Sequence, residues 1–293
     1  MSEVRIRVAR ATDKPAVESL CVQIWEGEDY VPEVWDEWLA DPHGQFVVAE
    51  LEGHVAGLAK LSRLADDEWW LEGLRVDPAH RRQGIAERLQ THLVEKTRQI
   101  GRGTLRLGTH SLNEPVHCIA ARTGFRRVAT YRFYRADPLP AAPPHPHTPT
   151  PLGEADLPSA WTLVSGSPRY RAAGGVYENF WTWENLTRER LARHLARERC
   201  WGFEAGGGLA ALALVCRAKE EDALDVGYVD GAEGLLVPIL RGLRGLAAQL
   251  GHTEVRFKPV DEPTLVASVE AAGYERSWDR DIWIFELQLE ERA

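Results

Sequence analysis

Cysteine is scarce in this chain. Its 293 residues include four cysteines, Cys21, Cys118, Cys200 and Cys216, and no two of them form a Cys-x-x-Cys pair. Closely spaced cysteines are typical of zinc sites and of small domains held by disulfides. Their absence argues against both, so we expect no metal and no disulfide framework.

Long apolar runs are also missing. No stretch of 18 apolar residues occurs, and the opening Met-Ser-Glu-Val-Arg lacks the apolar core of a signal peptide. We therefore expect a cytoplasmic protein with no membrane partner. Basic residues are fewer than acidic ones, which gives a net charge of −9. This charge argues against nucleic acid as a partner and is compatible with a cationic substrate.

Proline is distributed unevenly. Seven of the 17 prolines lie between Pro138 and Pro151, and such a run is typical of a semi-rigid, extended linker. The chain is also longer than a usual single domain. We therefore predict a first domain at residues 1–137, a linker at 138–151 and a second domain at 152–293.

The most informative segment runs from Leu74 to Ala86. It is typical of a strand that ends near Val76, a turn at Pro78, a basic loop containing Gly84, and a helix. The first N–H groups of a helix have no intrahelical partner, and the helix dipole adds positive charge there. A glycine also lets an anion approach the backbone. The segment therefore predicts an anion-binding cradle, although its spacing matches neither dinucleotide-binding folds nor P-loops.

The arrangement Arg-x-x-Gly-x-Ala at residues 81–86 resembles the acyl-coenzyme A pyrophosphate loop of the GNAT N-acetyltransferase superfamily. Residues 4–136 also follow that family's order of elements, from a strand near Ile6 to an Asn-helix-Gly-Phe segment at 113–125. The resemblance implies acetyl-coenzyme A as co-substrate and no metal. The residues implied to bind it, largely through the backbone, are Leu74, Arg75, Val76, Arg81, Arg82, Gln83, Gly84, Ile85, Ala86, Glu87 and Asn113.

The second half of the chain repeats the pattern of the first. A hairpin at 201–216, a strand at 224–230, a helix at 235–250 and a strand at 255–257 follow in the same order. We therefore predict an α/β (α+β) chain of two tandem GNAT-like domains. Each would have a mixed, mostly antiparallel, twisted sheet flanked by helices.

The second copy lacks the basic loop. Val76 to Gly101 spans 25 residues, whereas Val229 to Gly251 spans 22, and Glu233 stands where the first copy has arginines. Like charges repel strongly when they are partly desolvated. We therefore expect the second domain to be degenerate and unable to hold coenzyme A.

Glu72 is the candidate general base. The strand period of two places it on one face with Leu74 and Val76. The resemblance implies a carboxylate here that removes the amine proton, usually through a water, and burial would raise its pKa toward a useful range. The alternative is a structural ion pair with an arginine such as Arg106.

The leaving-group acid is where the sequence departs from the family. The usual tyrosine position is occupied by Ala120. His117, Tyr131 and Tyr134 are nearby candidates, of which we take Tyr134. Otherwise the thiolate leaves without a dedicated acid, because an ordinary thiol has a pKa of about 8.5.

These features predict an N-acetyltransferase that transfers an acetyl group to the primary amine of a small, cationic acceptor by direct attack on the thioester. Acids alternate with aromatics at residues 25–41, which suggests either a pocket for a cation or a solvated helix whose tryptophans pack inward. A non-catalytic acyl-coenzyme A sensor or scaffold is the alternative function. Modification of protein N-termini or lysines, and a monomer or a homodimer, stay open.

Overall fold

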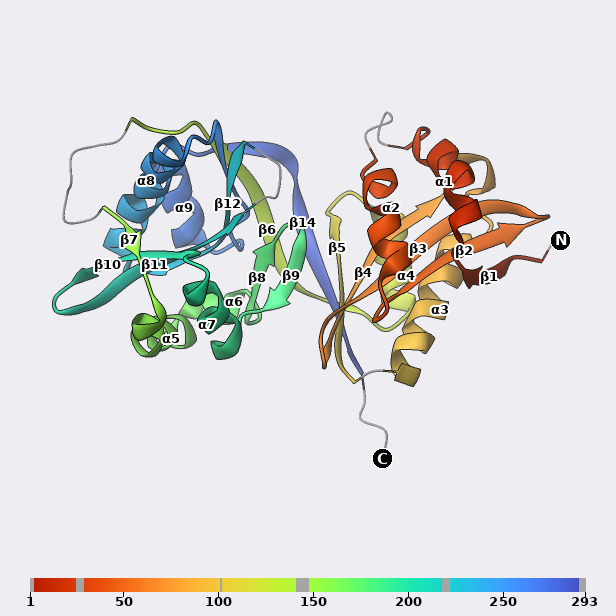
Figure 1. The fold of residues 1–293 in the computed structure, drawn as a ribbon, viewed down its shortest axis with the longest axis horizontal. Helices are drawn as coiled ribbons and strands as arrows, with labels where there is room; N and C mark the ends of the chain where they lie inside the picture. Colours follow the sequence, from red (N-terminus) through yellow and green to blue (C-terminus); the bar gives the residue numbers. More distant parts are fainter. Residues whose placement is uncertain (1–2, 25–28, 101, 141–147, 218–221, 290–293) are drawn as a thin grey trace. The chain divides into compact units, whose positions relative to one another are not determined.

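The chain forms two compact units. The computed structural model describes residues 3–24, 29–100, 102–140, 148–217 and 222–289 (Figure 1). Unit 1 comprises Met1–Gly108, Asn113–Arg127 and Phe285–Ala293, and unit 2 comprises Thr109–Leu112 and Val128–Ile284. Each unit has a mixed, mostly antiparallel sheet flanked by helices, so the predicted fold class is confirmed.

The sheet of unit 1 follows chain order, with the last residues of β14 (Glu275–Leu289) beyond β5. Its other strands are β1 (Arg5–Val8), β2 (Gln45–Leu51), β3 (His54–Ala65), β4 (Glu68–Val76) and β5 (Gly103–His110). The pairs up to β3–β4 are antiparallel, and β4 pairs with β5 in parallel.

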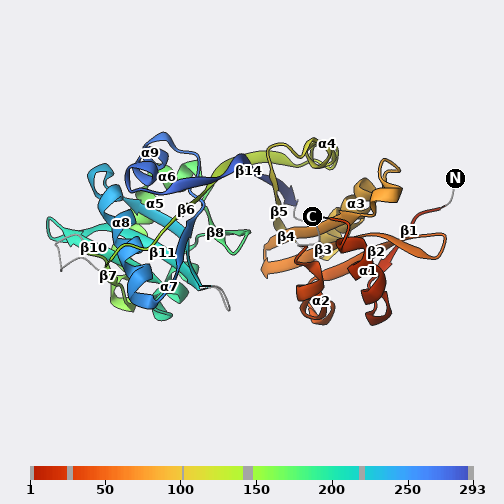
Figure 2. The same cartoon turned by 90° about the horizontal axis from the view of Figure 1, so that it is seen from above.

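Helices cover both faces of this sheet, as Figure 1 and Figure 2 show. Leu58 and the tryptophans of α2 share a core cluster with Phe46 on one face. Gly57, the neighbour of Leu58, instead lies against Ile85 and Leu89 of α3, because successive strand residues point to opposite faces. The helices are α1 (Lys14–Cys21) and α2 (Val31–Ala40) on the first face, α3 (Ile85–Ile100) on the second, and α4 (Glu114–Arg122) after β5.

The elements of unit 2 follow in chain order. Its strands are β6 (Arg126–Ala136), β7 (Thr150–Pro151), β8 (Val176–Asn179), β9 (Thr182–Asn185), β10 (Cys200–Ala205), β11 (Gly208–Arg217), β12 (Ala223–Gly231) and β13 (Glu254–Phe257). Its helices are α5 (Leu157–Gly166), α6 (Pro168–Ala172), α7 (Arg188–Ala196), α8 (Glu233–Leu250) and α9 (Pro263–Ala271).

Unit 2 repeats the topology of unit 1. Strands β10, β11 and β12 pair in antiparallel fashion, and β12 pairs with β13 in parallel, just as β2 to β5 do. Helix α8 joins β12 to β13 as α3 joins β4 to β5. The predicted tandem arrangement is therefore confirmed.

The sequence predicts a strand pair within residues 126–135 of the first domain. Two strands of the structure differ from this expectation. The segment forms one strand, β6, which belongs to unit 2 from Val128 onward and pairs with β13 there. In unit 1, residues 285–289 of β14 lie beyond β5, where Arg106 bonds Glu286. The compact units are thus divided differently from the predicted domains 1–137 and 152–293, whose boundaries stay a prediction.

Part of the predicted linker is ordered against unit 2. Thr150 and Pro151 form β7, which pairs with Gly202 and Trp201 of β10. The backbone N–H of Leu139 donates to the carbonyl of Arg244. The central residues of the predicted linker, 141–147, lie outside the described residues.

Helix α8 is the longest of the described helices. Gly251 ends it in a left-handed conformation with φ of 79°, which glycine adopts without steric cost. None of the described helices combines the length and apolar character needed to cross a membrane.

Asp225 on β12 is a buried carboxyl in the core of unit 2, with 5% of its surface exposed. Burial raises its pKa to about 6, although the charge of Lys258 partly offsets this effect. In the unfolded chain this carboxyl ionises at a lower pH, near its ordinary pKa of about 3.9. Stability is therefore lost as the pH rises from that value through about 6.

We expect Asp225→Asn to stabilise the protein at pH 8 and not at pH 4. Above pH 6 the ionised, buried carboxylate costs up to about 3 kcal/mol, which the neutral amide avoids. Thermal unfolding at both values measures the effect. Asp222→Asn, at an exposed position just before the same strand, is the control, and an equal gain at both pH values would contradict the prediction.

Candidate active site

Strand β4 contains a β-bulge at Gly73. Lys60 of β3 lies opposite Glu72 and Leu58 lies opposite Arg75, so three steps along β4 match two along β3. Gly73 has a φ of 64°, and a Cβ there would lie 2.5 Å from the Trp38 ring. Any other residue would meet both backbone strain and this ring.

The bulge overturns one sequence-based expectation. We expected Glu72 to share a face with Leu74 and Val76, but this is wrong, because a bulge shifts the alternation of side chains. Directly opposed residues point to the same face. Glu72 lies opposite Lys60 and Arg75 lies opposite Leu58. Since Lys60 and Leu58 are two residues apart on β3 and share a face, Glu72 shares its face with Arg75 instead. A lone glycine in a strand pattern indicates a bulge, so Gly73 is the residue of the sequence that indicates this one.

The same region leaves one edge of β4 open. The parallel register joins Glu68–Leu71 to Thr104–Leu107, and within the described residues it extends no further. Backbone groups of residues 72–76 on this edge are therefore not paired with β5. An extended amide chain, such as the pantetheine arm, can bond to them as an added strand would.

The turn after β4 is fixed at its start and open at its end. The backbone N–H of Asp77 donates to Ala56 at 3.0 Å, and the Asp77 carboxylate accepts from the N–H of Ala79 at 2.8 Å. Arg82 and Gly84 then adopt left-handed backbone conformations, with φ of 62° and 76°. A non-glycine residue in this conformation is uncommon and concentrates at functional sites, and nothing in the sequence signals it at Arg82.

Helix α3 begins directly after this turn. Ile85 is 1% exposed and packs beside Gly57, which anchors the first turn on the sheet. Within the described residues, no backbone hydrogen bond runs from the N–H groups of 84–87 to a residue before α3. Free N–H groups, the positive end of the helix dipole and the exposed Arg81 and Arg82 together suit a diphosphate.

The side chains of several predicted cofactor-binding residues are engaged elsewhere. The Arg75 guanidinium bonds Asp29 at 2.6 Å, and Glu87 pairs with Arg122 at 3.0 Å. Only their backbone groups are then available to a ligand. Gln83 and Gly84 are exposed, Leu74, Val76 and Ala86 are half-buried, and Asn113 precedes α4 without making a capping bond.

Glu72 has a polar neighbour that sequence reasoning missed. The hydroxyl of Ser62 donates to its carboxylate at 2.5 Å. Burial raises the pKa of Glu72, whereas the Ser62 hydrogen bond and the charge of Lys60 lower it and the nearby acids raise it further. The alternative pairing is not seen, because Arg106 bonds Glu68 at 2.7 Å and Glu286 at 2.9 Å.

Helix α2 places its tryptophans inward and its acids outward. Trp35 and Trp38 are 1% and 7% exposed, and their ring centroids lie 4.9 and 5.3 Å from that of Phe46. Asp36 and Glu37 are exposed. This supports the solvated-helix alternative for α2 itself, while residues 25–28 of the acidic segment lie outside the described residues.

The candidate leaving-group acids belong to different units. Tyr134 belongs to unit 2, is fully buried and donates to Glu270 at 2.8 Å. Tyr131 is also buried in unit 2, beside Trp183. Of the three candidates only His117 lies in unit 1, on α4. The role of Tyr134 stays a prediction that its bond to Glu270 does not support.

The corresponding turn of unit 2 has little space for a nucleotide. Eight residues, 77–84, separate β4 from α3, whereas Ala232 alone separates β12 from α8. The first turn of α8 carries Glu233. These features favour the expectation that this copy has no pyrophosphate loop, which stays a prediction.

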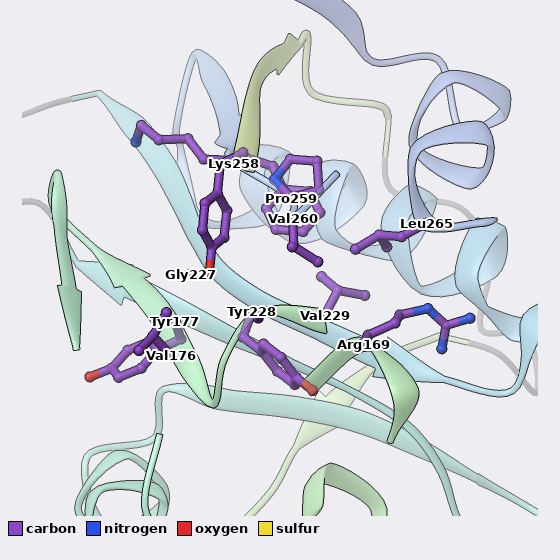
Figure 3. A pocket seen from close by; sticks show the side chains of 13 residues that line it. Arg169, Val176, Tyr177, Gly227, Tyr228, Val229, Lys258, Pro259, Val260 and Leu265 are labelled. Carbon is purple, nitrogen blue, oxygen red and sulfur yellow. The ribbon is translucent and has the colours of Figure 1, made fainter. Parts of the chain in front are cut away.

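Beyond Val226, where the pairing of β12 with β13 ends, the chain itself packs against β12. A Cβ on Gly227 would lie 2.4 Å from the Glu178 carbonyl oxygen of β8. A cavity of about 10 Å³ is left there, bounded by Gly227, Tyr228 and Val229 on one side and Pro259 on the other (Figure 3). Such a volume holds about one water.

Comparisons with known proteins agree with this geometry. A model of the acetyltransferase (GNAT) family matches residues 14–125. The N-alpha-acetyltransferase RimI of Mycobacterium tuberculosis is 30% identical over 135 residues, which cover 45% of this chain and 84% of that protein. The chain therefore belongs to the GNAT acetyltransferase family.

Solved structures show the same fold along the whole chain. A GCN5-related N-acetyltransferase from Sphaerobacter thermophilus has a TM-score of 0.69 at 15% identity, covering 99% of this chain and 97% of that one. A tandem GNAT protein from the clavulanic acid biosynthesis pathway has a TM-score of 0.56 at 17% identity, covering 99% and 100%. The protein is an acetyltransferase of tandem GNAT fold, and its family takes the acetyl group from acetyl-coenzyme A.

We expect Gly84→Asp to weaken acetyl-coenzyme A binding by at least about 100-fold. The substitution adds a negative charge where the diphosphate must bind and strains a left-handed backbone. Isothermal titration with acetyl-coenzyme A measures the loss.

Gly53→Asp is the matched control. Gly53 has a φ of 83° and open space around its Cβ position, as Gly84 has, but it lies in the turn between β2 and β3. Both variants share the backbone strain and the added charge. A difference in affinity between them therefore reports whether position 84 lies at the diphosphate site. Wild-type affinity in Gly84→Asp would show that the cofactor binds elsewhere.

Proposed function

We propose that the first domain acetylates the primary amine of a small, cationic acceptor, with acetyl-coenzyme A bound at Leu74–Val76 and at 82–87. The second domain is proposed to be non-catalytic. The observation that carries the proposal is the placement of Glu72. This half-buried carboxylate lies on β4, beside the edge left unpaired beyond Leu71.

The proposed reaction is direct attack. The amine nitrogen forms a bond to the thioester carbon, the carbon–sulfur bond breaks, and Glu72 receives the amine proton through a water. A backbone N–H of residues 74–76 donates to the carbonyl oxygen as it gains charge, an effect usually worth a few kcal/mol. The thiolate leaves without a dedicated acid, because an ordinary thiol has a pKa of about 8.5.

The charge around Glu72 supports a cationic acceptor. Glu37 and Asp41, both from the α2 region, are close enough to Glu72 to raise its pKa, and Glu37 is exposed. Tyr30 also lies near this group: burial raises the pKa of its phenol to about 12, and the charge of Glu72 contributes to this rise, whereas Arg75 opposes it. A positively charged substrate is attracted by such a group of acids and an aromatic face.

We expect Glu72→Gln to lower kcat by about 100-fold or more, because general base catalysis usually contributes 10² to 10⁴. The affinity for acetyl-coenzyme A should not change. Thiol release measured with a panel of small mono- and diamines tests this. If the wild-type protein binds acetyl-coenzyme A and turns over no amine, the sensor or scaffold function is correct instead.

The acceptor's charge is tested on helix α2. We expect Glu37→Gln to raise KM for a diamine by roughly fivefold, which corresponds to about 1 kcal/mol for one exposed charge, and to leave KM for a monoamine analogue that lacks the second ammonium group unchanged. Asp36→Asn is the control, since Asp36 is exposed on the same helix and pairs with Lys14 at 2.8 Å. Equal effects of both changes would contradict the proposed specificity. Peptide N-termini, tested in the same assay, represent the protein-substrate alternative.

A further inference from the structure

Lys60 is a fully buried cation in unit 1, with 1% of its surface exposed. It lies on β3 directly opposite Glu72 of β4, so both side chains point to the face covered by α2. Its ammonium bonds the carboxylate of Asp41 and the carbonyl of Leu61, the latter at 2.9 Å. A buried lysine is costly unless its charge is compensated, and Asp41 supplies that compensation.

Asp41 is held rigidly for this contact. Its second oxygen accepts from the backbone N–H groups of His43 at 2.9 Å and Gly44 at 3.1 Å. A Cβ on Gly44 would lie 2.3 Å from both the Lys60 ammonium and the Asp41 carboxylate. The turn after α2 therefore requires glycine so that the ion pair can form.

The groups that face Glu72 have unequal charges. From β3 it is faced by Lys60 and Ser62, from the α2 region by Glu37 and Asp41, and from the residue before α2 by Tyr30. Arg75 of β4 shares this face, but its guanidinium is paired with Asp29 at 2.6 Å, and of the other described groups Lys60 alone is cationic. Without it, burial and two neighbouring carboxylates would all favour the protonated form of Glu72, which is inactive as a base.

We propose that Lys60, clamped by Asp41, is a positioning residue that keeps Glu72 ionised and, together with Ser62, oriented as the general base. This inference rests on the proposed function, because it assumes that Glu72 accepts the proton. Lys60 itself does not touch the substrate in this scheme. Its effect is on the pH range over which Glu72 works.

The test is the pH dependence of kcat/KM for Lys60→Gln, whose neutral amide still offers a donor to Asp41. We expect the acidic limb of the pH profile to shift to higher pH by about one unit, so that kcat/KM at pH values below the limb falls roughly tenfold. Activity should recover at higher pH, and acetyl-coenzyme A affinity should stay unchanged. A purely structural role for Lys60 would lower activity at every pH and lower the unfolding temperature without moving the limb.

Two further variants make the outcome decisive. Ser62→Ala should move the limb in the same direction by a smaller amount, and it decides the matter if Lys60→Gln does not fold. Lys14→Gln removes a partly exposed cation from α1 and should leave the limb in place. A folded Lys60→Gln protein with a wild-type limb, or an unmoved limb in Ser62→Ala when only that variant folds, overturns the proposal.

The two proposals fail in different ways. If Glu72→Gln retains full activity, the assignment of the base is wrong and the proposed mechanism falls with it. If Glu72→Gln is inactive while Lys60→Gln keeps the wild-type limb, the base is correct and only the positioning role is wrong.

Discussion

The bulge of β4 is the constraint on which the candidate site depends. Gly73 takes a backbone conformation that other residues rarely adopt, and the Trp38 ring lies where its side chain would be. The extra residue turns Glu72 to the α2 face, opposite Lys60. Parallel pairing with β5 also stops just before it, at Leu71. One local irregularity thus provides both a turned carboxylate and an open strand edge.

Unit 2 shows that the same topology does not suffice for the same chemistry. Its sheet repeats the antiparallel and parallel pairs of unit 1, and a register shift occurs at Gly227. There, however, β8 packs directly on the irregular strand, and Glu178 forms a buried ion pair with Lys258 at 2.9 Å. The helix that follows begins almost at once, with an acid in its first turn. Cofactor binding depends on what fills the space beside the bulge and not on the bulge alone.

The sequence was sufficient for features encoded by neighbouring residues. The order of the elements from β2 to α4, the internal repeat and the turn before α3 follow from periodicity, glycine and proline, and all are found in the structure. The surroundings of Glu72 were not predictable in this way. Ser62, Lys60 and Asp41 reach it from a neighbouring strand and from the end of a helix, and no local pattern encodes their meeting. Arg106, the alternative partner for Glu72, is instead paired with Glu68 and Glu286.

The sheet that a strand joins is likewise not encoded by its neighbouring residues, as β6 and β14 show. Periodicity identifies residues 126–135 as extended, but it does not say which sheet they join. The three aromatic residues Tyr131, Phe133 and Tyr134 are each at most 3% exposed and belong to unit 2, so burial of these rings favours that sheet. The edge beyond β5 is then completed from the far end of the chain, where Glu286 meets Arg106. Unit 1 is therefore not identical with residues 1–137, because the end of β14 belongs to it and brings Glu286 to Arg106, 180 residues earlier in the sequence, which also pairs with Glu68.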